Sequence, residues 1–337
     1  MTDELDAALH ELYPAPDEGT DTVRRVRVRV LSGLDQPTVT RRRWRPSLSL
    51  AAAAVVLAAA VIVVVVRGAA PHGAMVEVAQ TLDTAADAQI RTVDEPVPAG
   101  RYRYIATHAR ALGQAPDAAV LFGSRSETWV PADPSGEWFQ LRTDTGERTR
   151  LLGTDEAIAA AGLDVVADPE RLSGRCGAFY PDSGDLCTAD GNWQSPSATF
   201  LAGLPRDPRK LYDRLRDDTE GHGRDPDQEV LVYVADALRS GLLPAGLRAA
   251  LYRALTHLPT LQITEQVATL DGHTGTALGV SAAGIQEEIV IDPVTGAFIG
   301  ERDRLTEDMA GIPAGTVIGF TTVRYAIVGK PWQRPPG

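Results

Sequence analysis

The chain has 337 residues and a formal net charge of −12, and its length allows one large folded core or two small ones. The negative charge is concentrated after residue 67, because residues 68–337 carry 24 basic and 37 acidic residues, a balance of −13. Since nucleic-acid binding needs a basic surface, this composition argues against a nucleic-acid partner.

An uninterrupted apolar run follows an arginine-rich N-terminal segment. From Leu48 to Val66 there are nineteen residues without a charge, Pro or Gly. At about 1.5 Å per residue, a helix of this length reaches roughly 28 Å, close to the hydrocarbon thickness of a bilayer. We therefore expect one transmembrane helix over 47–67 and the lipid bilayer as a partner. The alternatives are a soluble core helix and a cleaved signal peptide, but the run exceeds a usual signal h-region.

The distribution of positive charge predicts the topology of this span. After Arg67 no basic residue follows until Arg91, whereas four arginines stand directly before the span: Arg41, Arg42, Arg43 and Arg45. This asymmetry predicts that residues 1–46 are cytoplasmic and that the large C-terminal domain is extracytoplasmic at the cell membrane.

Within the N-terminal segment, residues 20–34 are ambiguous between helix and strand, with helix favoured. Four more arginines lie here, at positions 24, 25, 27 and 29. We favour the interpretation that these arginines help to set the membrane topology and are attracted to anionic lipid head groups. The alternative is that they form a docking segment for a cytoplasmic partner.

Residues 68–100 are expected to connect the span to the domain. Apolar residues recur at helical spacing over 74–90, which predicts an amphipathic stalk helix. The segment 94–100, DEPVPAG, is typical of a linker.

A first group of strands is predicted after residue 100. Alternating segments at 101–109, 126–130, 137–141 and 147–152 are separated by turn sequences that include Asp133-Pro134-Ser135-Gly136 and Thr143-Asp144-Thr145-Gly146. They predict an antiparallel meander.

Short helices and a disulfide are predicted in the middle of the chain. Thr154 is a suitable N-cap for a helix over 154–162. Cys176 and Cys187 are the chain's two cysteines, and outside the membrane a pair this close is expected to form a disulfide worth roughly 3 kcal/mol. A Cys-x-x-Cys redox motif and the further ligands of a zinc site are absent from the sequence around them.

Three longer helices are then predicted. Asp207 is a cap for the first, the second covers about 227–240, and the third begins at Pro244. The third helix carries an apolar stripe that we expect to line an apolar cavity, formed by Leu247, Leu251 and Leu255.

Strands resume in the C-terminal part, and Asp271-Gly272 is a strong hairpin signal. The expected strands are 260–270, 273–280, 285–292, 297–304 and 316–328. We expect residues 331–337 to be a disordered tail.

Strands, then helices, then strands indicate an α+β fold with a mainly antiparallel sheet. We expect an extracytoplasmic domain over 101–330, in which a curved, half-barrel-like sheet packs on the helices.

Catalytic and metal-binding motifs were sought without success. The sequence contains no His-Glu-x-x-His, no Gly-x-Ser-x-Gly, no P-loop and no Gly-x-Gly-x-x-Gly. His222, Asp225, Asp227 and Glu229 are clustered, but they lack calcium-loop spacing and fit a solvated linker better. Trp129, Trp138 and Trp193 fit sheet packing better than a ligand box. We therefore predict no catalytic residue, no cofactor and no metal.

Three segments together resemble an uncharacterised family of actinobacterial single-pass, membrane-anchored proteins. They are LAGLPRDPRKLYDRLR, LLPAGLRAALYRALTHLP and EEIVIDPVTGAFIGER. That family has no established activity and no assigned site to carry over. The element order of the outer domain is more remotely similar to lipoprotein carriers and to the sensing domains of anti-sigma-factor regulators, which are half-barrels with an apolar cavity.

These features predict a non-enzymatic membrane protein whose outer domain binds an apolar ligand, such as a lipid or a lipidated partner protein. The alternative is an anti-sigma-like regulator in which residues 1–34 hold a cytoplasmic sigma factor. A third hypothesis is an envelope hydrolase.

Overall fold

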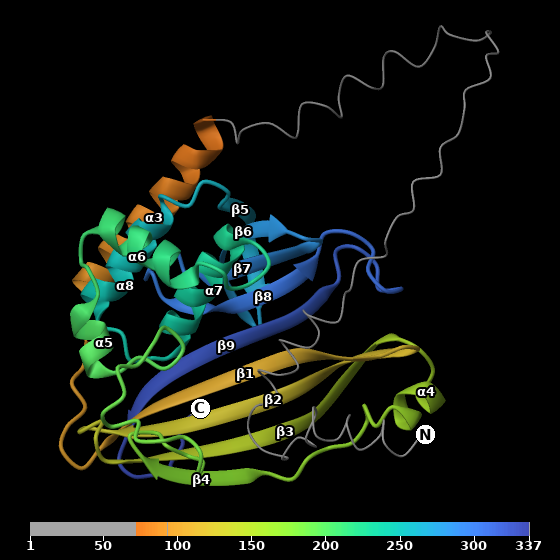
Figure 1. The fold of residues 1–337 in the computed structure, drawn as a ribbon, viewed down its shortest axis with the longest axis horizontal. Helices are drawn as coiled ribbons and strands as arrows, with labels where there is room; N and C mark the ends of the chain where they lie inside the picture. The colour runs from red at the N-terminus through yellow and green to blue at the C-terminus, as the bar shows by residue number, and fades with distance from the viewer. Residues whose placement is uncertain (1–71, 93, 337) are drawn as a thin grey trace, which may run out of the picture. The chain divides into compact units, whose positions relative to one another are not determined.

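A nine-stranded antiparallel sheet is the main element of the fold. The structure is a computed structural model that describes residues 72–92 and 94–336, shown in Figure 1. The strand order across the sheet is β4-β3-β2-β1-β9-β8-β7-β6-β5. The strands are β1 (Tyr102–Ala115), β2 (Ala118–Pro131), β3 (Glu137–Leu152), β4 (Glu170–Arg175), β5 (Gln262–Leu270), β6 (His273–Ala282), β7 (Ile285–Ile291), β8 (Phe298–Leu305) and β9 (Val317–Val328).

In the described residues the helices are α3 (His72–Arg91), α4 (Asp155–Ala160), α5 (Ala198–Gly203), α6 (Pro208–Thr219), α7 (Pro226–Arg239) and α8 (Ala245–Leu255). Among these helices, α3 precedes the first strand, α4 lies between β3 and β4, and α5–α8 lie between β4 and β5. Both predicted caps form, since Thr154 accepts from the N–H of Ala157 and Asp207 from that of Lys210. Asp225, which was not predicted as a cap, accepts from the first N–H groups of α7. The predicted α+β class and the antiparallel sheet are confirmed.

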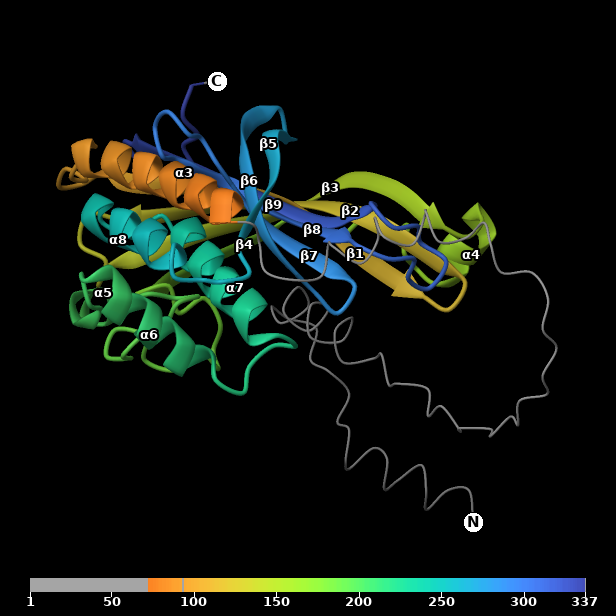
Figure 2. The same cartoon turned by 90° about the horizontal axis from the view of Figure 1, so that it is seen from above.

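The two faces of the sheet have different cover. Successive strand residues point to opposite faces, so we define the helical face as the face that bears Val130 and the tail face as the face that bears Trp129. On the helical face, α7 packs on β6, β7 and β8, while α6 and α8 complete the helical layer. Figure 2 shows α5–α8 on one side of the sheet and the C-terminal end of the chain on the other.

The main core lies between the helices and the helical face. Leu211 of α6, Val234 of α7 and Leu251 of α8 are fully buried there, together with Leu278 and Ile289 of the sheet. Burying a side chain of this size is worth roughly 1.5–3 kcal/mol, so this layer fixes where the helices sit.

Helix α3 is part of this core. It covers the helix predicted at 74–90, and its stripe of Val78, Leu82 and Ala85 is buried. It packs on α8 and β5, and Arg253 of α8 binds Asp87 at 2.6 Å. The sequence analysis expected a stalk here, but the apolar stripe docks the helix onto the domain instead.

The β5–β6 hairpin folds back across the tail face, which gives the sheet its half-barrel-like curvature. β5 pairs with β6 through register shifts, and such irregularities bend a strand. At the hairpin tip, Asp271 accepts hydrogen bonds from His108 of β1 at 2.9 Å and Thr322 of β9 at 3.1 Å. The hairpin predicted from Asp271-Gly272 is therefore present, and its aspartate also ties the tip to the middle of the sheet.

The first group of strands differs from the prediction. The segment 137–152 is one strand, not two strands joined by a turn at Thr143–Gly146. Asp144 accepts from the N–H of Gly146 at 2.9 Å and Gly146 has a φ of +74°, while the β2–β3 register shifts between Phe122 and Ser124. The turn residues thus form a bulge inside a long strand.

The predicted segments 1–46 and 47–67, with Arg41, Arg42, Arg43 and Arg45, lie outside the described residues. Within residues 72–92 and 94–336, no helix combines the length and the apolarity that crossing a bilayer requires.

Candidate functional site

The three leucines predicted to line an apolar cavity belong to the closed core. Leu247, Leu251 and Leu255 of α8 have no solvent-exposed surface. Because a water molecule cannot reach these side chains, an acyl chain cannot contact them in this conformation. The stripe on α8 was read correctly as an apolar face, but α3, α6 and the sheet cover it. The structure thus describes these three side chains as part of the packed core.

A pocket instead lies on the tail face, where the end of the chain crosses β2, β3 and β4. Its volume is about 380 Å³, and its lining side chains are Trp129, Leu141, Arg171, Trp332 and Arg334. We call this the tail-face pocket. The volume is near the lower end of the range for small-molecule sites, which is roughly 300–1,000 Å³. Trp129, Leu141 and Arg171 come from three adjacent strands, and Trp332 and Arg334 come from the chain end.

The chain end is ordered where it forms this pocket. The sequence analysis expected a disordered tail at 331–337, whereas Trp332 packs on Trp129 and Phe139 with ring centroids 5.2 and 5.6 Å apart. The carbonyl of Gln333 accepts a hydrogen bond from Trp129 Nε1 at 2.7 Å. The aromatic contacts and the hydrogen bond of the indole N–H offset the conformational entropy that this short terminal segment loses when it is held on the sheet.

A buried carboxylate holds the chain end in place. Glu127 of β2 is fully buried, and Arg334 donates to both of its oxygens, at 2.7 and 2.6 Å. Tyr104 of β1 also donates to it, at 2.5 Å. Burial alone raises the pKa of Glu127, but the hydrogen bonds from Arg334 and Tyr104 and the charge of Arg125 outweigh burial and lower that pKa below its ordinary value. Glu127 therefore stays ionised, and Arg334 is its bidentate partner.

Arg171 of β4 is the second cation at the tail-face pocket. Its guanidinium lies over the ring of Trp332, 5.3 Å from the centroid. Among the residues that the structure describes, the guanidinium of Arg171 has no hydrogen bond and no ion pair. A guanidinium stacked on a ring keeps its N–H donors available in the plane of the group.

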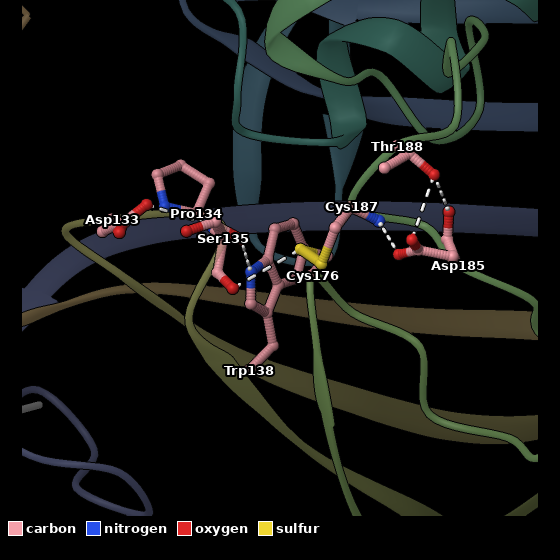
Figure 3. The surroundings of a disulfide bond; sticks show 8 residues. All are labelled: Asp133, Pro134, Ser135, Trp138, Cys176, Asp185, Cys187 and Thr188. Atoms are coloured by element: carbon pink, nitrogen blue, oxygen red, sulfur yellow. Dashed lines mark hydrogen bonds between the residues drawn. A yellow bond between two sulfur atoms is a disulfide. The ribbon is translucent and has the colours of Figure 1, made fainter.

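The predicted disulfide joins Cys176 to Cys187, with their Cα atoms 5.2 Å apart, directly after β4. Figure 3 shows Trp138 of β3 beside it, and the indole Nε1 of Trp138 donates to the carbonyl of Pro134 at 2.7 Å. Asp185 accepts from the N–H of Cys187 at 3.0 Å and so stabilises the turn before this cysteine. The disulfide thereby closes the loop that leaves β4, the strand that carries Arg171.

The cluster of acidic residues at 222–229 has structural roles. Asp225 caps α7, and Asp227 pairs with Arg216 at 2.6 Å. Within the described residues, no group of three or more His, Cys, Asp or Glu side chains is arranged to hold a metal ion.

His108 of β1 lies between two carboxylates. Nδ1 of His108 is 2.9 Å from Asp271, and Nε2 is 3.6 Å from Glu147. The hydroxyl of Thr322 donates to Asp271 at 3.1 Å and to the backbone carbonyl of His108 at 3.4 Å, and not to the imidazole. The two ring nitrogens thus face carboxylates, which suits a contact that holds the β5–β6 hairpin and does not resemble a nucleophile–base pair.

The sequence analysis missed most of this pocket. It named Trp129, but as packing, and it did not single out Arg171, Glu127 or Arg334. The available signal was the sequence Trp332-Gln333-Arg334 at the chain end, all three residues of which contact the sheet. The residues that contact this segment lie far apart in the sequence and are brought together only by the pairing of β1 through β4.

Comparisons with known proteins found no match: no family model, no curated relative and no solved structure is similar to the chain.

Proposed function

We propose that this chain is a single-pass membrane protein whose domain at 72–336 binds an apolar ligand or a lipid-modified partner in the tail-face pocket. In this proposal, residues 47–67 span the membrane, residues 1–46 are cytoplasmic and the domain is outside. The observation that carries the binding role is the pocket itself, in which two indole rings and Leu141 offer an apolar surface and arginines stand beside it.

The short distance along the sequence between the apolar run and α3 supports contact with membrane-derived ligands. The apolar run ends at Val66 and α3 begins at His72, so five residues, 67–71, lie between them. Fully extended, five residues reach at most about 18 Å. A domain tethered this closely to a bilayer meets lipid and lipidated proteins at high local concentration.

We propose binding and not catalysis because of the chemistry of the pocket. Trp129, Leu141 and Trp332 are not proton donors or nucleophiles in enzymes, and an arginine stays protonated at neutral pH. Such a lining suits recognition of shape and charge.

The test is to extract the full-length chain, purified from its source membrane, with organic solvent and to identify bound molecules by mass spectrometry. Leu141→Trp should remove the ligand because the larger side chain fills the pocket, whereas Leu141→Met, which nearly conserves volume, should retain it. Trp332→Ala is a second variant that removes one wall without changing a strand.

A stoichiometric molecule that is present in the wild type and in Leu141→Met but lost from Leu141→Trp and Trp332→Ala would support the proposal. Equal amounts of the same molecules in all four chains would show that extraction recovers only bulk lipid, and the proposed site would be wrong.

A further inference from the structure

The two arginines of the tail-face pocket differ in how far their charge is already satisfied. Arg334 donates two hydrogen bonds to the buried carboxylate of Glu127. Its charge is therefore matched within the protein. Moving it toward a ligand would leave Glu127 buried and unpaired, which is strongly unfavourable.

Arg171 has no such partner. Among the described residues, its guanidinium contacts the ring of Trp332 and no carboxylate. The neighbouring Arg125 adds positive charge, since it lowers the pKa of Glu127 through space. Both charged residues that line the pocket are arginines, and of these only Arg334 is paired with the buried Glu127.

The stacked position of Arg171 suits recognition of an anion. The guanidinium lies over the ring of Trp332, and among the described residues none of its N–H groups donates to a protein acceptor. A carboxylate or a phosphate accepts two parallel hydrogen bonds from such an edge. The apolar surfaces of Trp129 and Leu141 lie in the same pocket and suit a hydrocarbon or ring attached to that anion.

We infer that the tail-face pocket selects amphipathic anions, with Arg171 binding the carboxylate or phosphate and Trp129, Leu141 and Trp332 holding the adjoining apolar part. The inference rests on the proposed function and names its ligand class. A volume of about 380 Å³ accommodates the head end or one short chain of such a molecule and not a whole two-chain lipid.

The experiment uses the full-length chain reconstituted in phosphatidylcholine vesicles. Three photoreactive probes share one medium-length alkyl chain with a diazirine and end in a carboxylate, a phosphate or an alcohol. Labelling of peptides that contain Trp129, Leu141 or Trp332 is measured by mass spectrometry, with competition by the matching unlabelled compound.

In the wild type we expect the better of the two anionic probes to label the pocket about tenfold more strongly than the alcohol, as fits one charge-assisted contact at a partly exposed site. The comparison of carboxylate with phosphate distinguishes a fatty-acid-like ligand from a phospholipid head group. In Arg171→Gln that preference should fall to about one. Arg175→Gln is the matched control, because Arg175 lies on the same strand and face, is exposed and does not line the pocket.

The outcomes separate this inference from the proposed function. Equal labelling by all three probes in the wild type, or an anion preference that survives Arg171→Gln, would overturn the inference while leaving apolar binding in place. Absence of competed labelling by every probe would overturn both. A fall in Arg175→Gln equal to that in Arg171→Gln would show a diffuse charge effect and would also contradict the role of Arg171.

Discussion

The contact between Arg334 and Glu127 allows a quantitative prediction. Arg334→Ala removes two charge-assisted hydrogen bonds from a carboxylate that has no solvent-exposed surface. Breaking a buried ion pair by deleting one partner typically costs about 3–5 kcal/mol. Because the Arg334 side chain is itself 57% exposed, and Tyr104 still donates to Glu127, we expect a loss of about 2–3 kcal/mol in the free energy of unfolding.

The assay is urea denaturation of the full-length chain, followed by tryptophan fluorescence, because Trp129 and Trp332 report on this region. Lys330→Ala is the matched control, since Lys330 is an exposed cation on the same chain end with no ion pair in the described residues. The double variant Glu127→Gln with Arg334→Ala should recover part of the loss, because it leaves no unpaired buried charge. A loss in Arg334→Ala below about 0.5 kcal/mol, equal to that in Lys330→Ala, would refute the reasoning.

Three further predictions concern pH, the disulfide and the β5–β6 hairpin. The pKa of Glu127 is lowered in the folded state, so its ion pair stabilises the fold above the ordinary carboxyl pKa of 4.5, and this stabilisation is lost as the pH falls below that value. The difference in unfolding free energy between the wild type and Arg334→Ala should therefore shrink in urea titrations at stepwise lower pH. Replacing Cys176 and Cys187 together by Ser should lower the unfolding free energy by about 3 kcal/mol, and addition of a reductant to the wild type should give the same midpoint as the double variant. Asp271→Ala removes the contacts of the hairpin tip with His108 and Thr322, so hydrogen exchange of the amides in 268–275 should become roughly tenfold faster while the α6–α8 amides are unchanged.

The parts of the fold that local sequence specifies were predicted well. Caps such as Thr154 and Asp207 depend on a side chain and a backbone N–H three residues later. The Asp271-Gly272 turn likewise depends on residues that are adjacent in the chain. The order of the other strands and helices followed from such signals, whereas β4 and α5 were not predicted.

The errors came from properties that depend on distant neighbours. Thr143–Gly146 has the composition of a turn, but pairing with β2 keeps the chain in one strand and turns these residues into a bulge. The stripe of Leu247, Leu251 and Leu255 has the composition of a cavity wall or of a core, and only the packing of α3, α6 and the sheet decides between them.

The tail-face pocket illustrates the same limit. Trp332 and Glu127 are more than two hundred residues apart in the sequence, and the segment around Arg171 gave no strand signal. Their meeting depends on the antiparallel order β4-β3-β2-β1 and on the return of β9 beside β1, which bring the chain end across the sheet. Local patterns do not contain that information.

The most direct test of the account is the location at which a photoreactive amphipathic probe labels the full-length chain in vesicles. The account predicts competed labelling confined to the tail-face pocket, on peptides that contain Trp129, Leu141 or Trp332, and its loss in Leu141→Trp. Competed labelling that instead falls on α8 around Leu251, or that persists unchanged in Leu141→Trp, would contradict it.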